Sequence, residues 1–509
     1  MSDTQPTKIA IIGAGISGLC VAWNLRGDDR FKIDIYEKNH RIGGACHTGW
    51  VSIGGQYRFC DLGVNDFNTR AYTHVVKVMD EIGIPYGLLE DSACFYSGDQ
   101  PLYSKDLWYR ARAGKGGHPW EKQSVDYRAY TLGGLDYLPM PAALATEFAR
   151  FKKEAPLDLV ENAASFAEVT IGQYLTQKNY SPQFASTCIL PRVNAMYFMT
   201  DDPGQTAADM PFSAVMHYYV LQEGFGTHFD GPLRMYFKDG SQNWIERLAQ
   251  HLEANVLTGQ DVQVDWSGDD GQWGVWDRAA TGSPKALYDK VVFACHADQV
   301  VSAFRNWSGG PWNQIKPVLQ KFRYAPSTAF AHTDASLLPP DPNTWRTYNV
   351  RVHEPQGGLV HHDYSMTYLI NKHQNDGNSG RYDHFGGPQY FVSLNPAQIP
   401  AEDKILFDAN TGAPMIAKFM HNVLNFDALA AQQALLKYQQ DQAASPRSVL
   451  YTGGWCYGAG LHEECWIHGT AVAHALKTGT FALPKSSDAA GPAPHIAQVV
   501  MPSDGRPGS

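Results

Sequence analysis

A run of glycines near the start of the chain has the spacing that holds the diphosphate of a dinucleotide. Gly13-Ala14-Gly15-Ile16-Ser17-Gly18 matches the pattern GxGxxG, directly after the apolar run 8–13 and before the helical pattern 16–25. In such a turn the first glycine permits the sharp bend, the second lets the backbone approach a pyrophosphate, and the third lets helix and strand pack closely. The helix that follows directs free N–H groups at the phosphates. We therefore expect this turn to bind a diphosphate.

A carboxylate marks the end of the next expected strand, 31–36. Glu37 stands where an acid accepts hydrogen bonds from ribose hydroxyls, and Lys38 follows it. An acid at this position disfavours a 2′-phosphate, so NADP is not expected. Strand, glycine turn, helix, second strand and Glu37 together predict a Rossmann-type βαβ unit.

A second glycine pair indicates which dinucleotide is bound. In Arg41-Ile42-Gly43-Gly44 the backbone is expected to pass the phosphates once more, and Ala45 follows. This acid followed by a glycine pair resembles the FAD-binding signature of the amine oxidase and phytoene desaturase superfamily, which NAD dehydrogenases usually lack. Many amine oxidases have an arginine where this chain has Ala45. We therefore expect FAD, with its phosphates facing backbone donors and Arg41.

The resemblance covers most of the chain and is closest to a bacterial branch of that superfamily, known as NAD/FAD-binding proteins. It implies an α/β fold, with a Rossmann-type, glutathione-reductase-like FAD-binding domain and an inserted mixed α+β substrate domain, as in amine oxidases. This chain departs from the branch at Val64-Asn65-Asp66, which is more polar. The segments that carry the resemblance are 60–72, 288–304, 324–339, 366–374, 390–396 and 451–464.

The resemblance also implies where the parts of FAD lie. Val262 would contact the adenine edge through its backbone. The turn that begins with Gly454 and Trp455 and ends at His462 and Glu463 would face the flavin ring. The helix after this turn would direct its N-terminus at the pyrimidine carbonyl, where it stabilises the negative charge of reduced flavin.

The expected elements divide the chain into an interrupted cofactor domain and an insertion. After the βαβ unit we expect a helix at 68–82, and the Rossmann pattern returns with a helix at 244–252 and strands at 261–266, 272–276 and 290–297. A strand, a glycine-rich turn and a helix follow at 448–476, whereas the insertion carries strands at 365–370 and 389–394 and a helix at 427–441. We assign 1–84, 232–297 and 446–484 to an FAD-binding domain, 85–231 and 298–445 to a substrate domain with a helical insertion, and 485–509 to a disordered tail.

Two reactions are suggested by the superfamily. The first transfers a hydride between FAD and a largely apolar small molecule, by desaturation or double-bond isomerisation of a fatty-acid or isoprenoid-like substrate. Aromatic residues gathered between Tyr103 and Tyr137 suit such a substrate. The alternative is a flavin amine oxidase that produces an imine and hydrogen peroxide, with an aromatic cage drawn from Trp455, Tyr457 and Tyr368.

The sequence predicts the catalytic residues less clearly than it predicts the cofactor site. His462 and Glu463 are candidates because the resemblance puts them beside the flavin ring, and Tyr368 is a candidate from the cage. No second GxGxxG follows a strand, so reduced flavin would pass its electrons to oxygen or another acceptor, or return the hydride to the substrate.

Charge and composition exclude several other classes. A formal net charge of −10 without a basic cluster argues against nucleic acid as a partner. The chain lacks a signal-like start and an apolar run of about 18 residues, so we expect a cytoplasmic protein with at most peripheral membrane contact.

The 8 cysteines are expected to be reduced. FAD is expected to be non-covalent, because covalent amine oxidases carry their tethering cysteine upstream of the position of Cys456. We expect no metal at His361-His362-Asp363, and the oligomeric state stays open.

Overall fold

The computed structural model describes residues 5–69, 71–89, 91–106, 139–197, 199, 204–225, 234–267, 271–305, 310–352, 365–374, 388–396, 398–445 and 448–484. The expected tail at 485–509, the segment His361-His362-Asp363 and most of the aromatic residues between Tyr103 and Tyr137 lie outside these ranges.

A five-stranded parallel sheet is assembled from distant parts of the chain. Its strands are β1 (Thr7–Ile12), β2 (Phe31–Tyr36), β10 (Ala254–Leu257), β14 (Lys290–Phe293) and β20 (Val449–Tyr451). They lie in the order β10-β2-β1-β14-β20, and each neighbouring pair is parallel. Ile9, Ala10 and Ile11 in the central strand are fully buried, as expected for a parallel strand covered on both faces.

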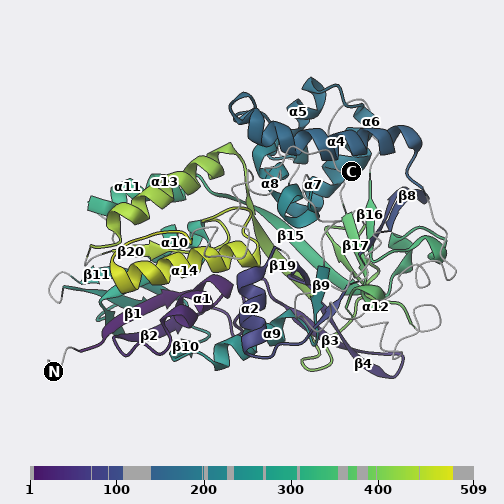
Figure 1. Cartoon of the computed structure of the whole chain (residues 1–509). Helices are drawn as coiled ribbons and strands as arrows, with labels where there is room; N and C mark the ends of the chain where they lie inside the picture. The colour runs from purple at the N-terminus through teal and green to yellow at the C-terminus, as the bar shows by residue number, and fades with distance from the viewer. Residues whose placement is uncertain are drawn as a thin grey trace.

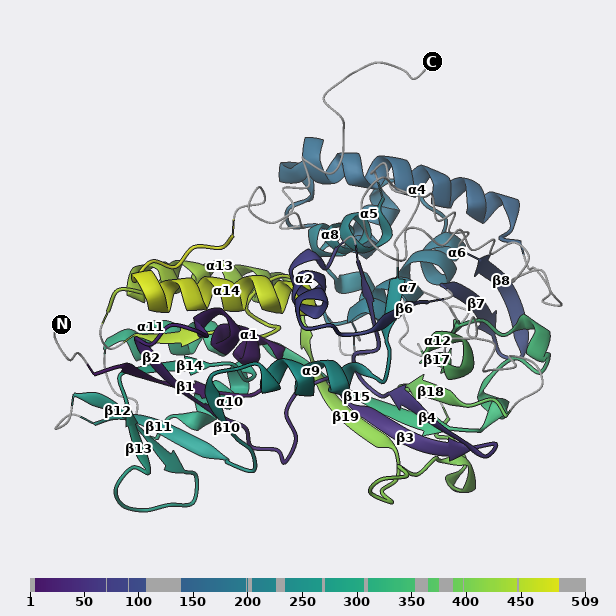
Figure 2. The ribbon, with the colours of Figure 1, turned by 60° about the horizontal axis from the view of Figure 1, so that its bottom comes forward.

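Helices cover one face of this sheet and a small antiparallel sheet covers the other (Figures 1 and 2). The helices nearest the strands are α1 (Ile16–Leu25), α13 (Phe426–Gln442) and α14 (His462–Thr478), and the small sheet consists of β11 (Val262–Ser267), β12 (Gln272–Asp277) and β13 (Ala286–Tyr288). α1 packs along α14, so the first and last described helices of the molecule are neighbours. The remaining helices around this region are α2 (Thr73–Glu81), α9 (Ser241–Gln250), α10 (Ala297–Ala303) and α11 (Gly310–Leu319).

A second, mixed sheet of seven strands lies beside the parallel sheet. It consists of β7 (Ser92–Ser97), β8 (Gln100–Asp106), β15 (Arg323–His332), β16 (Tyr348–Arg351), β17 (Ser365–Leu369), β18 (Phe391–Leu394) and β19 (Ile416–Val423). The order is β19-β15-β18-β17-β16-β7-β8, with β16 and β7 parallel and the other pairs antiparallel. Shorter pairings complete the strands: the hairpin β3 (Thr48–Ile53) with β4 (Gln56–Asp61), and the sheet of β5 (Asp66–Asn68), β9 (Arg234–Phe237) and β6 (Tyr86–Leu88).

A layer of helices lies above the mixed sheet in Figure 1. Its members are α4 (Ala142–Glu161), α5 (Ile171–Gln177), α6 (Pro182–Phe184), the π-helical turn η2 (Ala185–Ile189), α7 (Leu190–Tyr197) and α8 (Phe212–Glu223). The short helix α12 (Ile370–His373) follows β17. Single 3₁₀ turns lie at Ala163–Phe166, Ala207–Asp209, Ala335–Leu337, Pro342–Thr344 and Glu402–Lys404.

The predicted helices and strands agree best with the structure where the sequence pattern is local. The helix at 16–25 and the strand at 31–36 have the predicted bounds. The helix predicted at 68–82 begins later, at Thr73, because Asp66 to Asn68 pair with β9 as strand β5. The strand predicted at 290–297 ends at Phe293, and Ala297 already begins α10. The domain boundaries stay a prediction, and α13, which we placed in the substrate domain, contacts β20 of the parallel sheet.

In the described part of the chain, no helix combines the length and the apolar character that crossing a membrane requires.

Candidate functional site

The first glycine turn leaves open space at the start of α1. Gly13 has φ +115°, and a Cβ there would lie 2.6 Å from the carbonyl oxygen of Ala294. A Cβ on Gly18 would lie 2.2 Å from the carbonyl oxygen of Gly13, so this glycine allows α1 to approach β1. A Cβ on Gly15, by contrast, would meet no atom within 4 Å. The space beside Gly15 therefore suits a diphosphate held by the N-terminus of α1.

The second glycine pair docks on the first. The Gly43 N–H donates to the carbonyl oxygen of Ala14 at 2.8 Å. A Cβ on Gly44 would lie 3.5 Å from the Cα of Gly15, so the two glycine turns face each other. Gly44 and Ala45 are exposed, and Gly43 and Gly44 both have positive φ. Both turns thus present bare backbone to the same space.

Glu37 lies where this space meets the end of β2. Its side chain is 7% exposed, and its carboxylate accepts the N–H of Ala14 at 3.0 Å and that of Asn39 at 2.9 Å. The Glu37 carbonyl accepts the N–H of Gln260 at 2.8 Å, which holds the start of β11, including buried Val262, against the same edge. Lys38, the next residue along, is exposed. The predicted ribose and adenine contacts therefore lie side by side, and their roles stay predictions.

Arg41 donates hydrogen bonds within its own loop. Its guanidinium donates to the carbonyl oxygens of Cys46 at 2.6 Å and Gly44 at 2.8 Å. Burial is the main influence that lowers the pKa of Arg41. The side chain therefore braces the second glycine turn, and its expected contact with a phosphate is not needed to explain its position.

The opposite wall of the site comes from the segment after β4. A Cβ on Gly63 would lie 1.9 Å from the carbonyl oxygen of Ala45 and 3.0 Å from the ring of Phe419 on β19. The N–H of Val64 donates to the same Ala45 carbonyl at 3.1 Å. Gly63 is therefore required where the cofactor loop meets the mixed sheet.

The glycine-rich turn after β20 folds back on itself. A Cβ on Gly460 would lie 2.3 Å from the carbonyl oxygen of Gly454. Trp455 is 1% exposed, and its Nε1 donates to the carbonyl oxygen of Cys295 at 2.8 Å, beyond the end of β14. Gln432 on α13 donates to the carbonyl of Trp455 at 3.1 Å. The turn is thus fastened to the carboxyl ends of the parallel strands, where ligands of such sheets bind.

The two acidic residues at the start of α14 have separate tasks. Glu464 accepts the N–H of Leu461 at 2.9 Å and so satisfies the backbone of the N-cap residue of α14. Burial raises its pKa to about 7, against the lowering effect of backbone N–H groups. Glu463 instead caps α2, as its carboxylate accepts the N–H groups of His74 at 2.9 Å and Val75 at 3.0 Å. This engagement does not favour the catalytic role that we considered for Glu463.

His462 is buried at the first position of α14. Its Nε2 lies 3.5 Å from the Sγ of Cys46, just after the second glycine turn. Burial lowers the pKa of His462 to about 4, so the imidazole is neutral near pH 7. The structure therefore places His462 against the loop after the second glycine turn, and its positions beside the flavin and in catalysis stay predictions.

The rings that we considered for an aromatic cage come from β17 and from the turn after β20, and their role as a cage stays a prediction. Tyr368 on β17 packs its ring against Tyr348 at 5.5 Å and against His373 at 5.1 Å. The Tyr457 ring stacks on His468 at 6.5 Å. The Trp455 ring packs on Phe322 and Tyr451. No ring contact among the described residues joins Tyr368 to either Trp455 or Tyr457.

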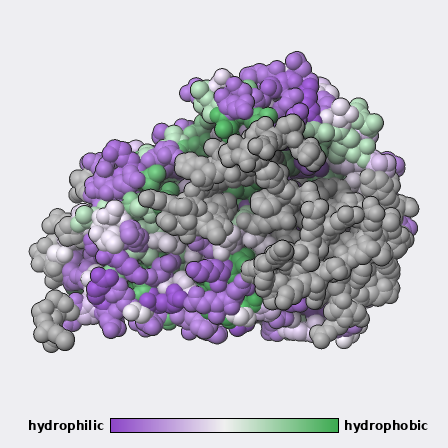
Figure 3. All heavy atoms as spheres, in the orientation of Figure 1, coloured by the Kyte–Doolittle hydropathy of each residue, from purple (hydrophilic) through white to green (hydrophobic). Residues whose placement is uncertain are grey.

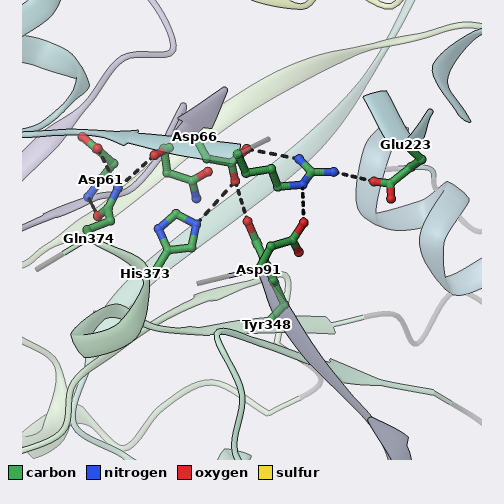
Figure 4. A network of polar contacts seen from close by, with 9 residues as sticks. Asp61, Asp66, Asp91, Glu223, Tyr348, His373 and Gln374 are labelled. Atoms are coloured by element: carbon green, nitrogen blue, oxygen red, sulfur yellow. Dashed lines mark hydrogen bonds and ion pairs between the residues drawn. The ribbon is translucent and has the colours of Figure 1, made fainter. Parts of the chain in front are cut away.

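A buried charge network explains the polar departure at Val64-Asn65-Asp66. Arg234 on β9 pairs with Asp66 at 3.3 Å, Asp91 at 3.2 Å and Glu223 at 2.5 Å. Figure 4 shows these acids converging, together with Tyr348, whose hydroxyl donates to Asp66 at 2.9 Å. Hydrogen bonds and the charge of Arg234 outweigh burial and lower the pKa of Asp66 to about 2. We did not predict this network, because its partners are far apart in the sequence and no local motif signals it.

A second buried acid fastens the hairpin β3–β4 to its neighbours. Asp61 accepts the N–H of Ser241 at 3.0 Å and the Thr48 hydroxyl, and Gln374 donates to it at 2.7 Å. Burial raises the pKa of Asp61 to about 7. Asp61 thus ties the start of α9 and the end of α12 to the strand that leads to Gly63.

Comparison with known sequences identifies the nucleotide-binding part. A family described as NAD(P)-binding Rossmann-like domain matches residues 11–82. The flavin-dependent L-tryptophan oxidase of Lentzea aerocolonigenes is 30% identical over 88 residues, which make up 17% of this chain and 18% of that protein. The corticosteroid-binding protein of Candida albicans is 37% identical over 111 residues, or 20% of this chain and 21% of that protein. The alignment thus spans about a fifth of each relative.

Solved structures match nearly the whole chain. A putative protoporphyrinogen oxidase from Exiguobacterium sp. has a TM-score of 0.58 at 14% identity and covers 94% of this chain and 100% of its own. Putrescine oxidase has a TM-score of 0.56 at 13% identity, covering 93% and 99%. The CLA-producing fatty acid isomerase from P. acnes has a TM-score of 0.56 at 14% identity, covering 93% and 100%. These structures confirm the expected α/β fold, which this chain shares with putrescine oxidase and the fatty acid isomerase.

Proposed function

We propose that the protein is an oxidoreductase that binds FAD non-covalently and transfers a hydride between the flavin and a largely apolar small molecule. The observation that carries the proposal is the open space beside Gly15, next to the contact of Gly15 with Gly44 and to the Glu37 carboxylate that accepts the Ala14 N–H. Two bare backbone turns and the N-terminus of α1 suit a diphosphate, and Glu37 suits a ribose. FAD supplies the hydride chemistry when it is bound.

The residues of this chain would hold and shield the cofactor. The glycine turns and Val262 would bind the adenosine diphosphate part, and the Gly454–Gly460 turn with the N-terminus of α14 would face the flavin ring. His462 is buried and neutral near pH 7. One of its ring nitrogens therefore holds a proton that it can donate, and the other can accept one. The fatty acid isomerase and the oxidases that share the fold support desaturation or double-bond isomerisation as the reaction class, with amine oxidation as the alternative.

The cofactor proposal is tested by FAD retention in paired variants. Gly15→Leu places a side chain in the open space beside Gly15. In the absence of FAD the variant should therefore melt at the wild-type temperature, and its affinity for FAD should fall at least tenfold. Glu37→Arg should also abolish retention. Acid precipitation of the wild type should release the flavin into solution. If both variants keep their FAD absorbance, the site is misplaced, and if the wild type stays colourless after FAD is added, the proposed function fails.

The reaction class is then read from the products. Isomerisation gives no net oxygen uptake, and desaturation requires an added electron acceptor. Formation of hydrogen peroxide and an imine from an amine would support the alternative.

A further inference from the structure

Arg192 on α7 is held by only one of its three guanidinium nitrogens. Nη1 donates to the carbonyl oxygen of Cys188 and to the hydroxyl of Tyr103 at 3.3 Å. Nε and Nη2 have no hydrogen-bond partner within the described ranges, and the residue as a whole is half-buried. No carboxylate among the described residues pairs with Arg192. The free Nε–Nη2 edge is the edge that binds a carboxylate with two parallel hydrogen bonds.

The surroundings fix Arg192 in an apolar setting. The π-helical turn η2 precedes α7, and the carbonyls of Thr187 and Cys188 in this turn accept hydrogen bonds from Tyr103 and Arg192. The guanidinium carbon lies 4.5 Å from the ring centroid of Phe95 and 4.9 Å from that of Phe148. These contacts hold the cation in place before any ligand binds, which reduces the entropy that binding must overcome.

A second polar group beside Arg192 is buried and unpartnered. The hydroxyl of Tyr219 on α8 makes no hydrogen bond to a described residue, although the side chain is 1% exposed. The Tyr219 ring stacks on that of Phe225 at 4.7 Å, and the Phe225 ring lies 5.9 Å from the Phe148 ring that Arg192 contacts, so both groups belong to one aromatic cluster. Burial raises the pKa of the Tyr219 phenol, and the charge of Arg192 opposes this rise. A buried hydroxyl without a partner has lost its hydrogen bonds to water and gained none in return, which is unfavourable. A ligand oxygen at this position would relieve that loss.

Helix α7 connects this pair of groups to the cofactor site. α7 contacts β19, the strand that carries Phe419 against Gly63. At the other end of α7, Tyr197 is buried and its hydroxyl donates to the carbonyl oxygen of Ala214 on α8 at 2.8 Å. A helix rises 1.5 Å per residue, so Arg192 stands roughly 8 Å along α7 from Tyr197. Figure 3 shows hydrophobic surface under the helical layer that contains α7.

We propose that Arg192 and Tyr219 bind the carboxylate of an otherwise apolar acid, whose hydrocarbon part extends along α7 toward the flavin-facing turn. The proposal rests on the proposed function and names its substrate class. One arginine edge and one hydroxyl match a planar monoanion, whereas a protonated amine would be repelled by the guanidinium.

Isothermal titration calorimetry tests the proposal with decanoate and decan-1-ol, which share a chain and differ in charge. The wild type should bind decanoate at least tenfold more tightly than decan-1-ol. Arg192→Met should weaken decanoate binding about 10- to 100-fold and leave decan-1-ol unchanged. Tyr219→Phe should weaken decanoate binding severalfold without lowering the melting temperature, because the lost hydroxyl has no partner in the unliganded protein.

Arg150→Met is the matched control. Arg150 lies in the same helical layer with its guanidinium 3.9 Å from the ring centroid of Tyr180, but it pairs with Glu154. This variant should keep the preference for decanoate. Should Arg192→Met fail to fold, Arg192→Gln and Tyr219→Phe decide the question, since both leave a packed side chain in place and glutamine carries no charge.

Equal binding of the two ligands by the wild type would overturn the proposal, as would a preference that survives in Arg192→Met or in both of the fallback variants. FAD absorbance is recorded on the same samples. Protein that holds FAD but does not discriminate between the ligands contradicts this inference alone. Protein without FAD contradicts the proposed function, and the titration still measures the carboxylate preference.

Discussion

Glu463 and His74 are joined through both the backbone and the side chain of the histidine. One carboxylate oxygen of Glu463 accepts the His74 N–H at 2.9 Å and lies 2.6 Å from its Nδ1, while the other oxygen accepts the Val75 N–H at 3.0 Å. Glu463 thereby ties the first turn of α14 to the first turn of α2. A carboxylate at the N-terminus of α2 also interacts favourably with the dipole of that helix. This relationship makes Glu463 a positioning residue of the turn that would face the flavin.

Replacing Glu463 with alanine should therefore lower the stability of the fold more than it lowers the rate of turnover. The change leaves two backbone N–H groups without their acceptor, so we expect the free energy of unfolding to fall by about 2–3 kcal/mol. Chemical denaturation of the variant and the wild type measures the difference. Glu253→Ala is the control, because the Glu253 carboxylate also accepts one backbone N–H but lies in an exposed contact. Unchanged stability with abolished turnover would restore the catalytic interpretation.

Gly15 and Gly18 should respond differently to the same substitution. Gly18→Ala places a Cβ 2.2 Å from a backbone oxygen, so the variant without cofactor should melt at a lower temperature, by an equivalent of about 1–3 kcal/mol. Gly15→Ala meets no atom and should melt as the wild type does when FAD is absent. Differential scanning calorimetry on cofactor-free protein distinguishes the two, and an equal loss in both variants would contradict the assignment of open space at Gly15.

These two glycines show which part of the site a sequence can reveal. The diphosphate turn is contiguous, so each residue of Gly13 to Gly18 could be assigned from spacing alone, and Glu37 follows at the end of the next strand. Arg192 and Tyr219 carry no such signal, since their roles depend on which groups are missing around them after folding. Arg41 shows what local sequence leaves out: its guanidinium donates to the nearby carbonyls of Cys46 and Gly44, and its predicted contact with a phosphate stays a prediction.

Glu464 should give the protein a stability that falls as the pH rises. Burial raises its pKa from 4.5 to about 7, so between these values the folded state retains a proton that the unfolded state has lost. The stabilisation is fully present below pH 4.5 and is lost as the pH passes 7. Glu464→Gln cannot titrate, so its stability relative to the wild type should improve from pH 5 to pH 8, by up to about 3 kcal/mol. Melting curves across this range measure the trend, and a pH-independent difference would contradict it.

Removing the central cation of the acidic network should be among the most damaging single changes. Arg234→Met leaves Asp66, Asp91 and Glu223 buried together without the guanidinium that joins them. We expect a loss of about 3–5 kcal/mol in the free energy of unfolding. Arg278→Met serves as the control, since its partner Asp261 is exposed and such surface pairs contribute about 0–1 kcal/mol. Similar urea midpoints for the two variants would show that the network is not structural.

The position of β20 and α14 has a consequence for how the protein is made in the cell. β20 pairs with β14 at the edge of the parallel sheet, and α14 lies against α1, so residues beyond 448 complete a unit begun by β1 at residue 7. A ribosome must therefore have released nearly the whole described chain before the sheet can close. Contacts this distant in sequence slow folding and leave intermediates with exposed apolar strands. We expect FAD to enter after synthesis is finished, and the unfinished chain to depend on chaperones until then.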